Sequence, residues 1–136
     1  MKFNSYGIKF PFINSTSGDF FEKTISSDEE LRSNLIHLLL TRKGSRYFLP
    51  SFGTRLYEYI FEPSDDRTFS AIESEIRDSV EKFIPQLQIK NIEITDEEKE
   101  AINEINDNQK YSVKVRIDYI NTSSAFGSSN FIILNI

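Results

Sequence analysis

Two carboxylates, Glu58 and Glu62, lie four positions apart in a segment whose apolar residues recur at helical spacing, with Asp65 and Asp66 just beyond. On a helix such a pair has Cβ atoms roughly 6 Å apart. Glycoside hydrolysis uses two carboxyl groups about 5 to 9.5 Å apart, one of them with a pKa raised by desolvation. Glu58 and Glu62 fall opposite most of the apolar stripe, however, where water keeps a carboxylate ionised. We therefore interpret the pair as a solvated face and expect no catalytic residues.

The 136-residue chain has no Cys and a single His, His37. Without Cys there are no disulfides, thiolate nucleophiles or thiolate metal sites. One His cannot build a triad with a second His or a two-His metal site, so we interpret His37 as a helix residue at the edge of the core. We expect no metal, no cofactor and no small-molecule substrate.

Residues 41–55 contain four cations (Arg42, Lys43, Arg46 and Arg55) and no carboxylate, although the chain carries a formal net charge of -5. Such local reversal of sign is typical of a docking surface. The segment lacks the glycine-rich pattern of a phosphate loop, and a pI of about 4.9 opposes nucleic-acid binding. We expect Arg42 and Arg46 to form hydrogen bonds to carbonyls or carboxylates, either within the domain or on a partner.

Three helical segments are predicted to position these residues. Ser27 and Glu30 have the spacing of a capping box, and the leucines that follow predict a first helix over about residues 28–41, ended by Gly44. A second, short helix precedes Pro63. The third has an apolar stripe between its cap, Ser64 or Asp65, and Pro85.

The apolar period then changes from helical to alternating. Residues 87–94 and 111–119 predict two half-buried antiparallel strands, with a bulge near Lys90 or Asn91. Between them, residues 96–107 hold six acids and one Lys, which indicates a solvated excursion.

The chain ends in a flexible linker plus terminal strand over residues 122–136, in which Ser- and Gly-rich residues precede the apolar run 131–136. This strand either completes the protein's own sheet or adds to the sheet edge of a partner. Residues 1–18 are predicted to form an extended arm. No window approaches the roughly 18 apolar residues needed to span a bilayer, so we expect no membrane insertion. We predict a single α+β domain over residues 1–136, with an N-terminal extended arm and three helices packed on one face of an antiparallel sheet of at least three strands.

One block of the sequence resembles a known family. The string TRKGSR at residues 41–46, followed by Pro50, Phe52-Gly53, Leu56 and Phe61, resembles the gene-twenty-five-like baseplate wedge family of contractile phage tails. The segment YGIKFPF at residues 6–12 is similar to that family's usual opening, and the likeness covers about residues 6–120.

This resemblance implies a structural subunit of the virion tail baseplate, made and assembled in the host cytoplasm. Its implied partners are the other baseplate wedge subunits, which form a core bundle, and the tail sheath protein, whose assembly it initiates by strand pairing. The family's Glu-Pro-Arg tripeptide, associated with gripping the core bundle, is replaced here by Ile84-Pro85-Gln86. The predicted partner-binding residues are Arg42, Arg46, Phe52, Gly53, Phe83, Ile84, Pro85, Gln86, Phe131, Ile132, Ile133, Leu134, Asn135 and Ile136.

Two alternatives stay open at this point. The same motifs fit a type VI secretion or phage-tail-like particle baseplate component, and gene context separates the two, because neighbouring capsid genes indicate a phage and a neighbouring secretion ATPase does not. The family also bears an old lysozyme label. A peptidoglycan-cleaving lysozyme is disfavoured, because the acids that it needs are neither paired in an evident cleft nor set in apolar surroundings.

Overall fold

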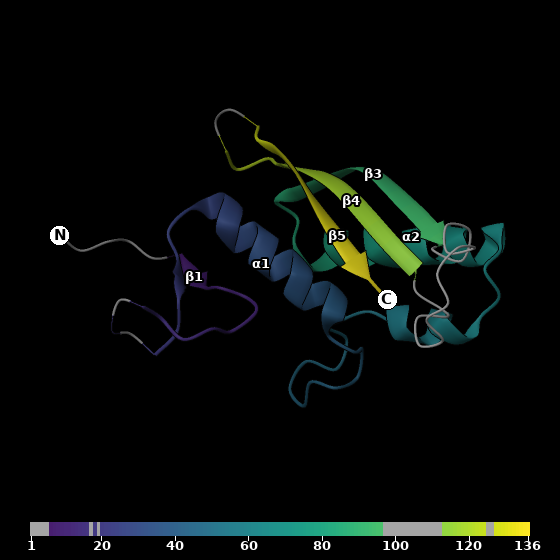
Figure 1. Cartoon of the computed structure of the whole chain (residues 1–136), viewed down its shortest axis with the longest axis horizontal. Coiled ribbons are helices and arrows are strands. Elements are labelled where there is room, and N and C mark those ends of the chain that lie inside the picture. The colour runs from purple at the N-terminus through teal and green to yellow at the C-terminus, as the bar shows by residue number, and fades with distance from the viewer. Residues whose placement is uncertain (1–5, 17, 19, 97–112, 125–126) are drawn as a thin grey trace, which may run out of the picture.

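The computed structural model describes residues 6–16, 18, 20–96, 113–124 and 127–136. It is a mixed α/β structure with antiparallel sheets, as predicted, in which a three-stranded sheet lies over two α-helices (Figure 1). In chain order the elements are β1 (Gly7–Ile8), β2 (Lys23–Thr24), α1 (Ser27–Leu40), the 3-10 helix η1 (Leu56–Phe61), α2 (Asp66–Phe83), β3 (Leu87–Asp96), β4 (Val113–Asn121) and β5 (Ser129–Asn135).

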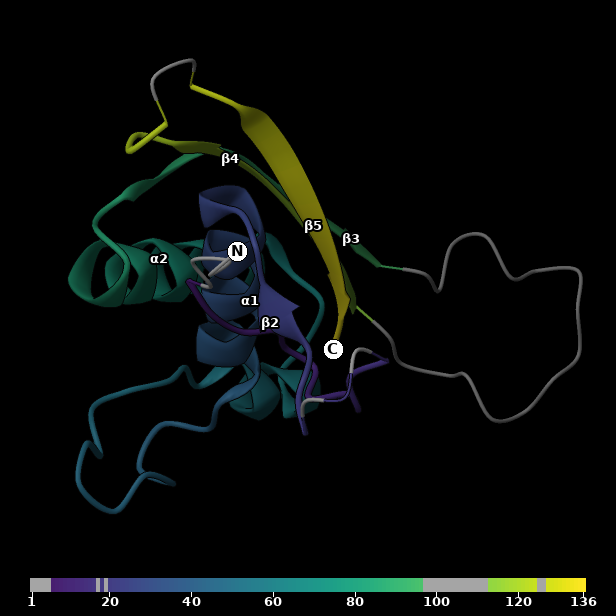
Figure 2. The same cartoon turned by 90° about the vertical axis from the view of Figure 1, so that its left-hand side faces the viewer.

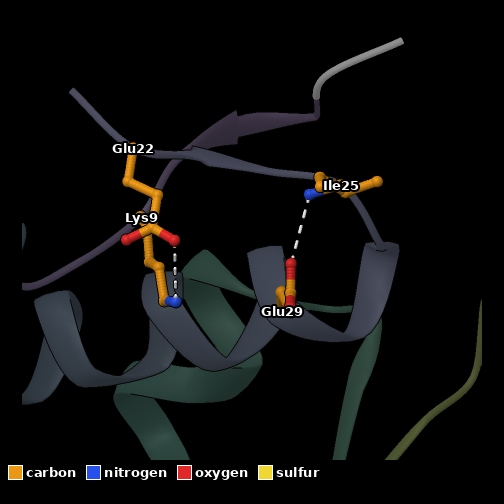
Figure 3. Close-up of polar contacts among 4 residues, drawn as sticks. All are labelled: Lys9, Glu22, Ile25 and Glu29. Atoms are coloured by element: carbon orange, nitrogen blue, oxygen red, sulfur yellow. Dashed lines mark hydrogen bonds and ion pairs between the residues drawn. The ribbon is translucent and has the colours of Figure 1, made fainter. Parts of the chain in front are cut away.

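The N-cap of helix α1 is Ser26, one residue before Ser27, the predicted capping residue. The Ser26 hydroxyl accepts a hydrogen bond from the Glu29 backbone N–H at 3.2 Å, and the Glu29 carboxylate accepts one from the Ile25 N–H at 3.2 Å (Figure 3). Both registers have the same Ser-x-x-Glu spacing, so the spacing alone does not choose between them. The predicted C-terminal role of Gly44 is also wrong, because the helix ends at Leu40 and is capped by Thr41.

The second predicted helix is a 3-10 helix rather than an α-helix. Its six residues lie between a glycine turn and Pro63, which makes it longer than most 3-10 helices. The third predicted helix is α2, and Asp65 is its cap, since the Asp65 carboxylate accepts a hydrogen bond from the Thr68 N–H at 2.8 Å.

The three-stranded sheet has the order β3-β4-β5 and is antiparallel throughout. The predicted bulge is confirmed, because the register shifts between Ile89 and Asn91. Strand β5 pairs with β4 from Ser129 to Asn135, which confirms that the terminal strand belongs to the protein's own sheet. The predicted acidic excursion lies almost wholly outside the described residues.

A single core joins the sheet to the helices. Figure 2 shows α1 and α2 on the same side of the curved sheet. Alternate residues of β4 and β5 point toward the helices, and the leucines of α1 meet the isoleucines of α2 beneath them. The buried cluster consists of Leu31, Leu35, Leu38, Leu39, Leu56, Ile72, Ile76, Val80, Ile84, Leu87, Val115, Ile117, Tyr119, Ile132 and Leu134.

The N-terminal segment, which we predicted as an extended arm, contributes one strand to a second, smaller sheet. Strands β1 and β2 form a two-stranded antiparallel ribbon, with Gly7 opposite Thr24 and Ile8 opposite Lys23. An ion pair of 3.4 Å between the Lys9 ammonium and the Glu22 carboxylate also joins its two sides (Figure 3). The ribbon lies beside α1 (Figures 1 and 2).

A polar contact ties the start of α1 to the turn between β4 and β5. The Asp28 carboxylate accepts hydrogen bonds from the Asn121 side-chain amide at 2.7 Å and from the Ser128 hydroxyl at 2.8 Å. Asn121 is fully buried. These two hydrogen bonds, that from Asn121 first, lower the pKa of Asp28, because both favour the ionised form.

Replacing Asp28 with Asn is expected to lower the free energy of unfolding at pH 7 by about 1 kcal/mol, because both hydrogen bonds lose a charged acceptor. The folded pKa lies below the ordinary value of 3.8, so the contribution of the charge is complete above that value and disappears as the pH falls through the folded pKa. Urea unfolding of both proteins as a function of pH measures the difference. Glu30→Gln is the control, since it removes a charge from the same helical turn; an equal loss there would show a helix-dipole effect instead.

Candidate partner-binding surfaces

Residues 41–55, here called the basic loop, are closed at their base by a close backbone approach. The Thr54 N–H donates to the Thr41 carbonyl at 2.9 Å, and the Lys43 N–H donates to the Thr54 carbonyl at 3.0 Å. Gly53 has a φ of +112°, and a Cβ atom there would lie 2.4 Å from the Thr41 carbonyl oxygen. The buried Thr54 hydroxyl donates to the Leu39 carbonyl at 2.8 Å, which fixes this base on the end of α1. Only glycine fits at position 53.

The two predicted arginines stack on aromatic rings. The Arg42 guanidinium lies 3.8 Å from the centroid of the Tyr57 ring, and that of Arg46 lies 4.5 Å from the centroid of the Phe52 ring. Within the described residues neither guanidinium forms an ion pair or a hydrogen bond, so of the two alternatives that we considered, polar contacts within the domain are not found there. Stacking holds each planar group while leaving its N–H groups for other acceptors.

Phe52 joins the basic loop to the rest of the fold. Its ring centroid lies 5.1 Å from that of Phe83 at the end of α2 and 5.7 Å from that of His37 on α1. His37 in turn stacks on Phe10 of the N-terminal segment, at 5.3 Å. Burial, and secondarily the positive charge of Arg46, lower the pKa of His37, so that it is neutral at pH 7. Phe52 and Gly53 therefore act within the fold, and they position the loop.

The sequence analysis missed the most exposed part of this loop. The side chains of Tyr47 and Phe48 are 92% and 95% exposed, and Leu49 beside them is 43% exposed. Figures 1 and 2 show the basic loop projecting from the body beyond the end of α1. The sequence did contain a signal for this exposure: three consecutive apolar residues lie among cations and belong to no helical or alternating apolar pattern.

The α2–β3 junction, residues 83–86, divides into inward and outward residues. Ile84 is only 5% exposed and belongs to the core, and Phe83 is half-buried against Phe52. Pro85 and Gln86 are exposed. The Gln86 carbonyl accepts hydrogen bonds from the N–H and hydroxyl of Thr122, at 2.9 and 2.8 Å. Pro85 and Gln86, rather than Ile84, thus face a potential partner.

Strand β5 lies at one edge of the three-stranded sheet. The reciprocal hydrogen bonds between Val113 and Ile136, at 3.1 and 2.9 Å, set the alternation of the ladder. By that alternation, residues 131, 133 and 135 direct their backbone N–H and C=O groups away from β4. Phe131 and Ile133 also expose their side chains on the outer face, whereas Ile132 and Leu134 are buried. We call this outward side the free edge of β5, since no described strand pairs with it.

The carboxylates that we considered for catalysis do not form a site. Glu58 lies within η1, whereas Glu62 follows its end with an extended backbone, so the two carboxylates do not lie along one face of a helix. Glu58 accepts a hydrogen bond from the Tyr57 hydroxyl at 3.1 Å. The depression beside η1, of about 50 Å³, has Glu62 as its one lining carboxylate. Across the described residues no cluster of His, Asp or Glu is suited to hold a metal ion, and no described helix is long and apolar enough to span a membrane.

Comparison with known proteins gives a family match. The model of a family described as baseplate wedge protein gp25 matches residues 26–124. The chain is also 34% identical over 70 residues to the baseplate wedge protein gp25 of Enterobacteria phage T4, a match that covers 49% of this chain and 53% of that protein. The matched region thus spans about half the length of this curated relative.

Solved structures share the fold at low sequence identity. A chain of the anti-feeding prophage baseplate has a TM-score of 0.68 at 21% identity, with 87% of this chain and 86% of that chain covered. A putative tail lysozyme from Geobacter sulfurreducens has a TM-score of 0.67 at 17% identity, with coverages of 82% and 90%. A chain of the postcontracted pyocin R2 baseplate has a TM-score of 0.51 at 14% identity, with coverages of 92% and 96%.

Replacing Gly53 with Ala is expected to lower the free energy of unfolding by about 3 kcal/mol, because the new methyl group meets the Thr41 carbonyl and the backbone is in a left-handed conformation. Gly44→Ala is the matched control, since Gly44 has a φ of +88° but open space around its Cβ position. We expect it to lose about 1 kcal/mol. Urea unfolding measures both, and equal losses would contradict the close approach at Gly53.

Proposed function

Because the chain belongs to the baseplate wedge protein gp25 family, we propose that it is a non-enzymatic structural subunit of a contractile phage tail baseplate. In this role it holds the core bundle formed by the other wedge subunits and initiates assembly of the tail sheath. The family match over residues 26–124 carries the proposal. Its site of action is the virion tail baseplate, after synthesis in the host cytoplasm.

The α2–β3 junction is the proposed contact with the core bundle. Exposed Pro85 and Gln86 support this assignment, and the half-buried Phe83 beside them adds apolar surface. Ile84 supports the junction from inside the core. With neither charge of the family tripeptide present, the contact is made by apolar packing and by the neutral Gln86 amide.

The free edge of β5 is the proposed contact with the sheath protein. Outward N–H and C=O groups at residues 131, 133 and 135 offer a template on which a partner strand can form main-chain hydrogen bonds. The exposed side chains of Phe131 and Ile133 lie on the outer face of the same strand, where an added strand would cover part of them. Backbone pairing and apolar burial therefore support the same contact.

Ile133→Pro is expected to block sheath nucleation while the wedge still forms. A proline there removes an outward N–H group and leaves the ladder between β4 and β5 intact, because residue 133 does not bond to β4. Co-expression with the neighbouring tail proteins, followed by size-exclusion chromatography and electron microscopy, measures both outcomes.

Ile133→Thr is the control for this experiment, because it changes the side chain but retains the N–H group. It should nucleate sheath, and both variants should have similar thermal unfolding midpoints. Normal sheath growth by Ile133→Pro would refute the proposed strand pairing.

The purified protein is expected to release no muropeptides from bacterial cell walls, because Glu58 and Glu62 do not flank a common cleft. A Glu58→Gln/Glu62→Gln variant should behave identically, with a known muramidase as the positive control. Chromatography of the soluble products measures the release. Muropeptides produced by the wild type and lost in the double variant would instead support a peptidoglycan hydrolase.

A further inference from the structure

The tip of the basic loop, formed by Tyr47, Phe48 and Leu49, is an exposed apolar projection that does not belong to the hydrophobic core. The Tyr47 and Phe48 rings touch each other, edge to face, with their centroids 5.4 Å apart. With both side chains more than nine-tenths exposed, the tip leaves two large apolar surfaces in water. Aromatic side chains of this kind, beside arginine, are typical of the residues that dominate protein interfaces.

The loop holds this tip in a defined position. The Gly44 N–H donates to the Pro50 carbonyl at 2.8 Å, and the Phe52 N–H donates to the Leu49 carbonyl at 3.0 Å, so hydrogen bonds enclose the tip on both sides. Below them lies the base at Gly53 and Thr54. Because the loop is already ordered, binding through it would lose little conformational entropy.

The charges around the tip indicate what it meets. Residues 41–55 hold four cations and no carboxylate, which leaves 12 of the chain's 16 cations beside all 21 of its carboxylates elsewhere. Lys43 is exposed, and neither Arg42 nor Arg46 bonds to a described acceptor. A complementary surface therefore places carboxylates around an apolar depression.

We propose that the tip of the basic loop inserts into an apolar depression, rimmed by carboxylates, on a neighbouring protein subunit of the same baseplate. An extended anionic surface such as a lipid bilayer fits less well, because the remaining acidic surface of the chain would be repelled by it. A protein partner meets the loop alone. The proposal relies on the assignment to a baseplate only for the choice of partner proteins.

Phe48→Ser in the full-length chain tests the insertion. We expect its binding to one of the purified neighbouring baseplate subunits to be roughly tenfold weaker or more, because a central aromatic anchor is lost. Tyr47→Ser/Phe48→Ser should bind more weakly still. The matched control is Phe61→Ser, which removes a ring of similar exposure from η1 and should bind like the wild type. Thermal unfolding midpoints of all three should equal that of the wild type, since none of these rings is in the core.

A charge substitution and a change of salt concentration test the proposed attraction between the cations of the basic loop and the carboxylates of the partner. Lys43→Glu should weaken the same binding several-fold, and wild-type binding should weaken between about 0.05 and about 0.5 M salt, because screening reduces attraction between the cations and the carboxylates. Isothermal titration calorimetry measures both.

The proposal is overturned if no baseplate subunit binds the wild type, or if Phe48→Ser binds as tightly as the wild type. Binding of the wild type to vesicles of phosphatidylglycerol, lost in Phe48→Ser, in place of binding to a subunit would also overturn it. Ile133→Pro should bind the subunit normally, so failure of loop insertion and failure of strand pairing by β5 give different patterns.

Discussion

The close approach between the backbone at Gly53 and the carbonyl of Thr41 is the constraint on which the position of the basic loop depends. It brings the end of α1 and the start of η1 together without an intervening side chain. With this base closed, Phe52 reaches both His37 and Phe83, so one ring connects two helices. The same closure sets the arginines over their rings and raises the loop tip away from the body. A loop without it would present its cations and aromatics in many arrangements.

Residues that stabilise the fold lie directly beside exposed residues in the sequence. At the α2–β3 junction, Ile84 is buried while the adjacent Pro85 and Gln86 are exposed. In the basic loop, Phe52 is half-buried against the core, whereas Phe48 is exposed. Each presented group is therefore positioned by a neighbour that is anchored in the core, which keeps small surfaces rigid in a chain of this length.

Regular periodicity made most of the fold predictable, and the failures have local physical causes. The leucines of α1, the stripe of α2 and the broken alternation at the β3 bulge each leave a repeating signal. Strands β1 and β2 are two residues long, too short for any period, and depend on packing against α1. The contacts of candidate site residues were harder to predict. An exposed arginine can stack on a ring, form an ion pair or bind a partner, and no pattern in the sequence indicates that Arg42 lies over the Tyr57 ring.

In β5, the parity of a residue decides its role. Even-numbered residues such as Ile132 and Leu134 bury their side chains and bond to β4, whereas Phe131 and Ile133 turn both backbone and side chain outward. Under the proposed strand pairing, a change of side chain at an odd position would alter partner preference while leaving the stability of the fold nearly constant. Single substitutions at those few positions could then change which partner strand is accepted, and each variant along the way would still fold.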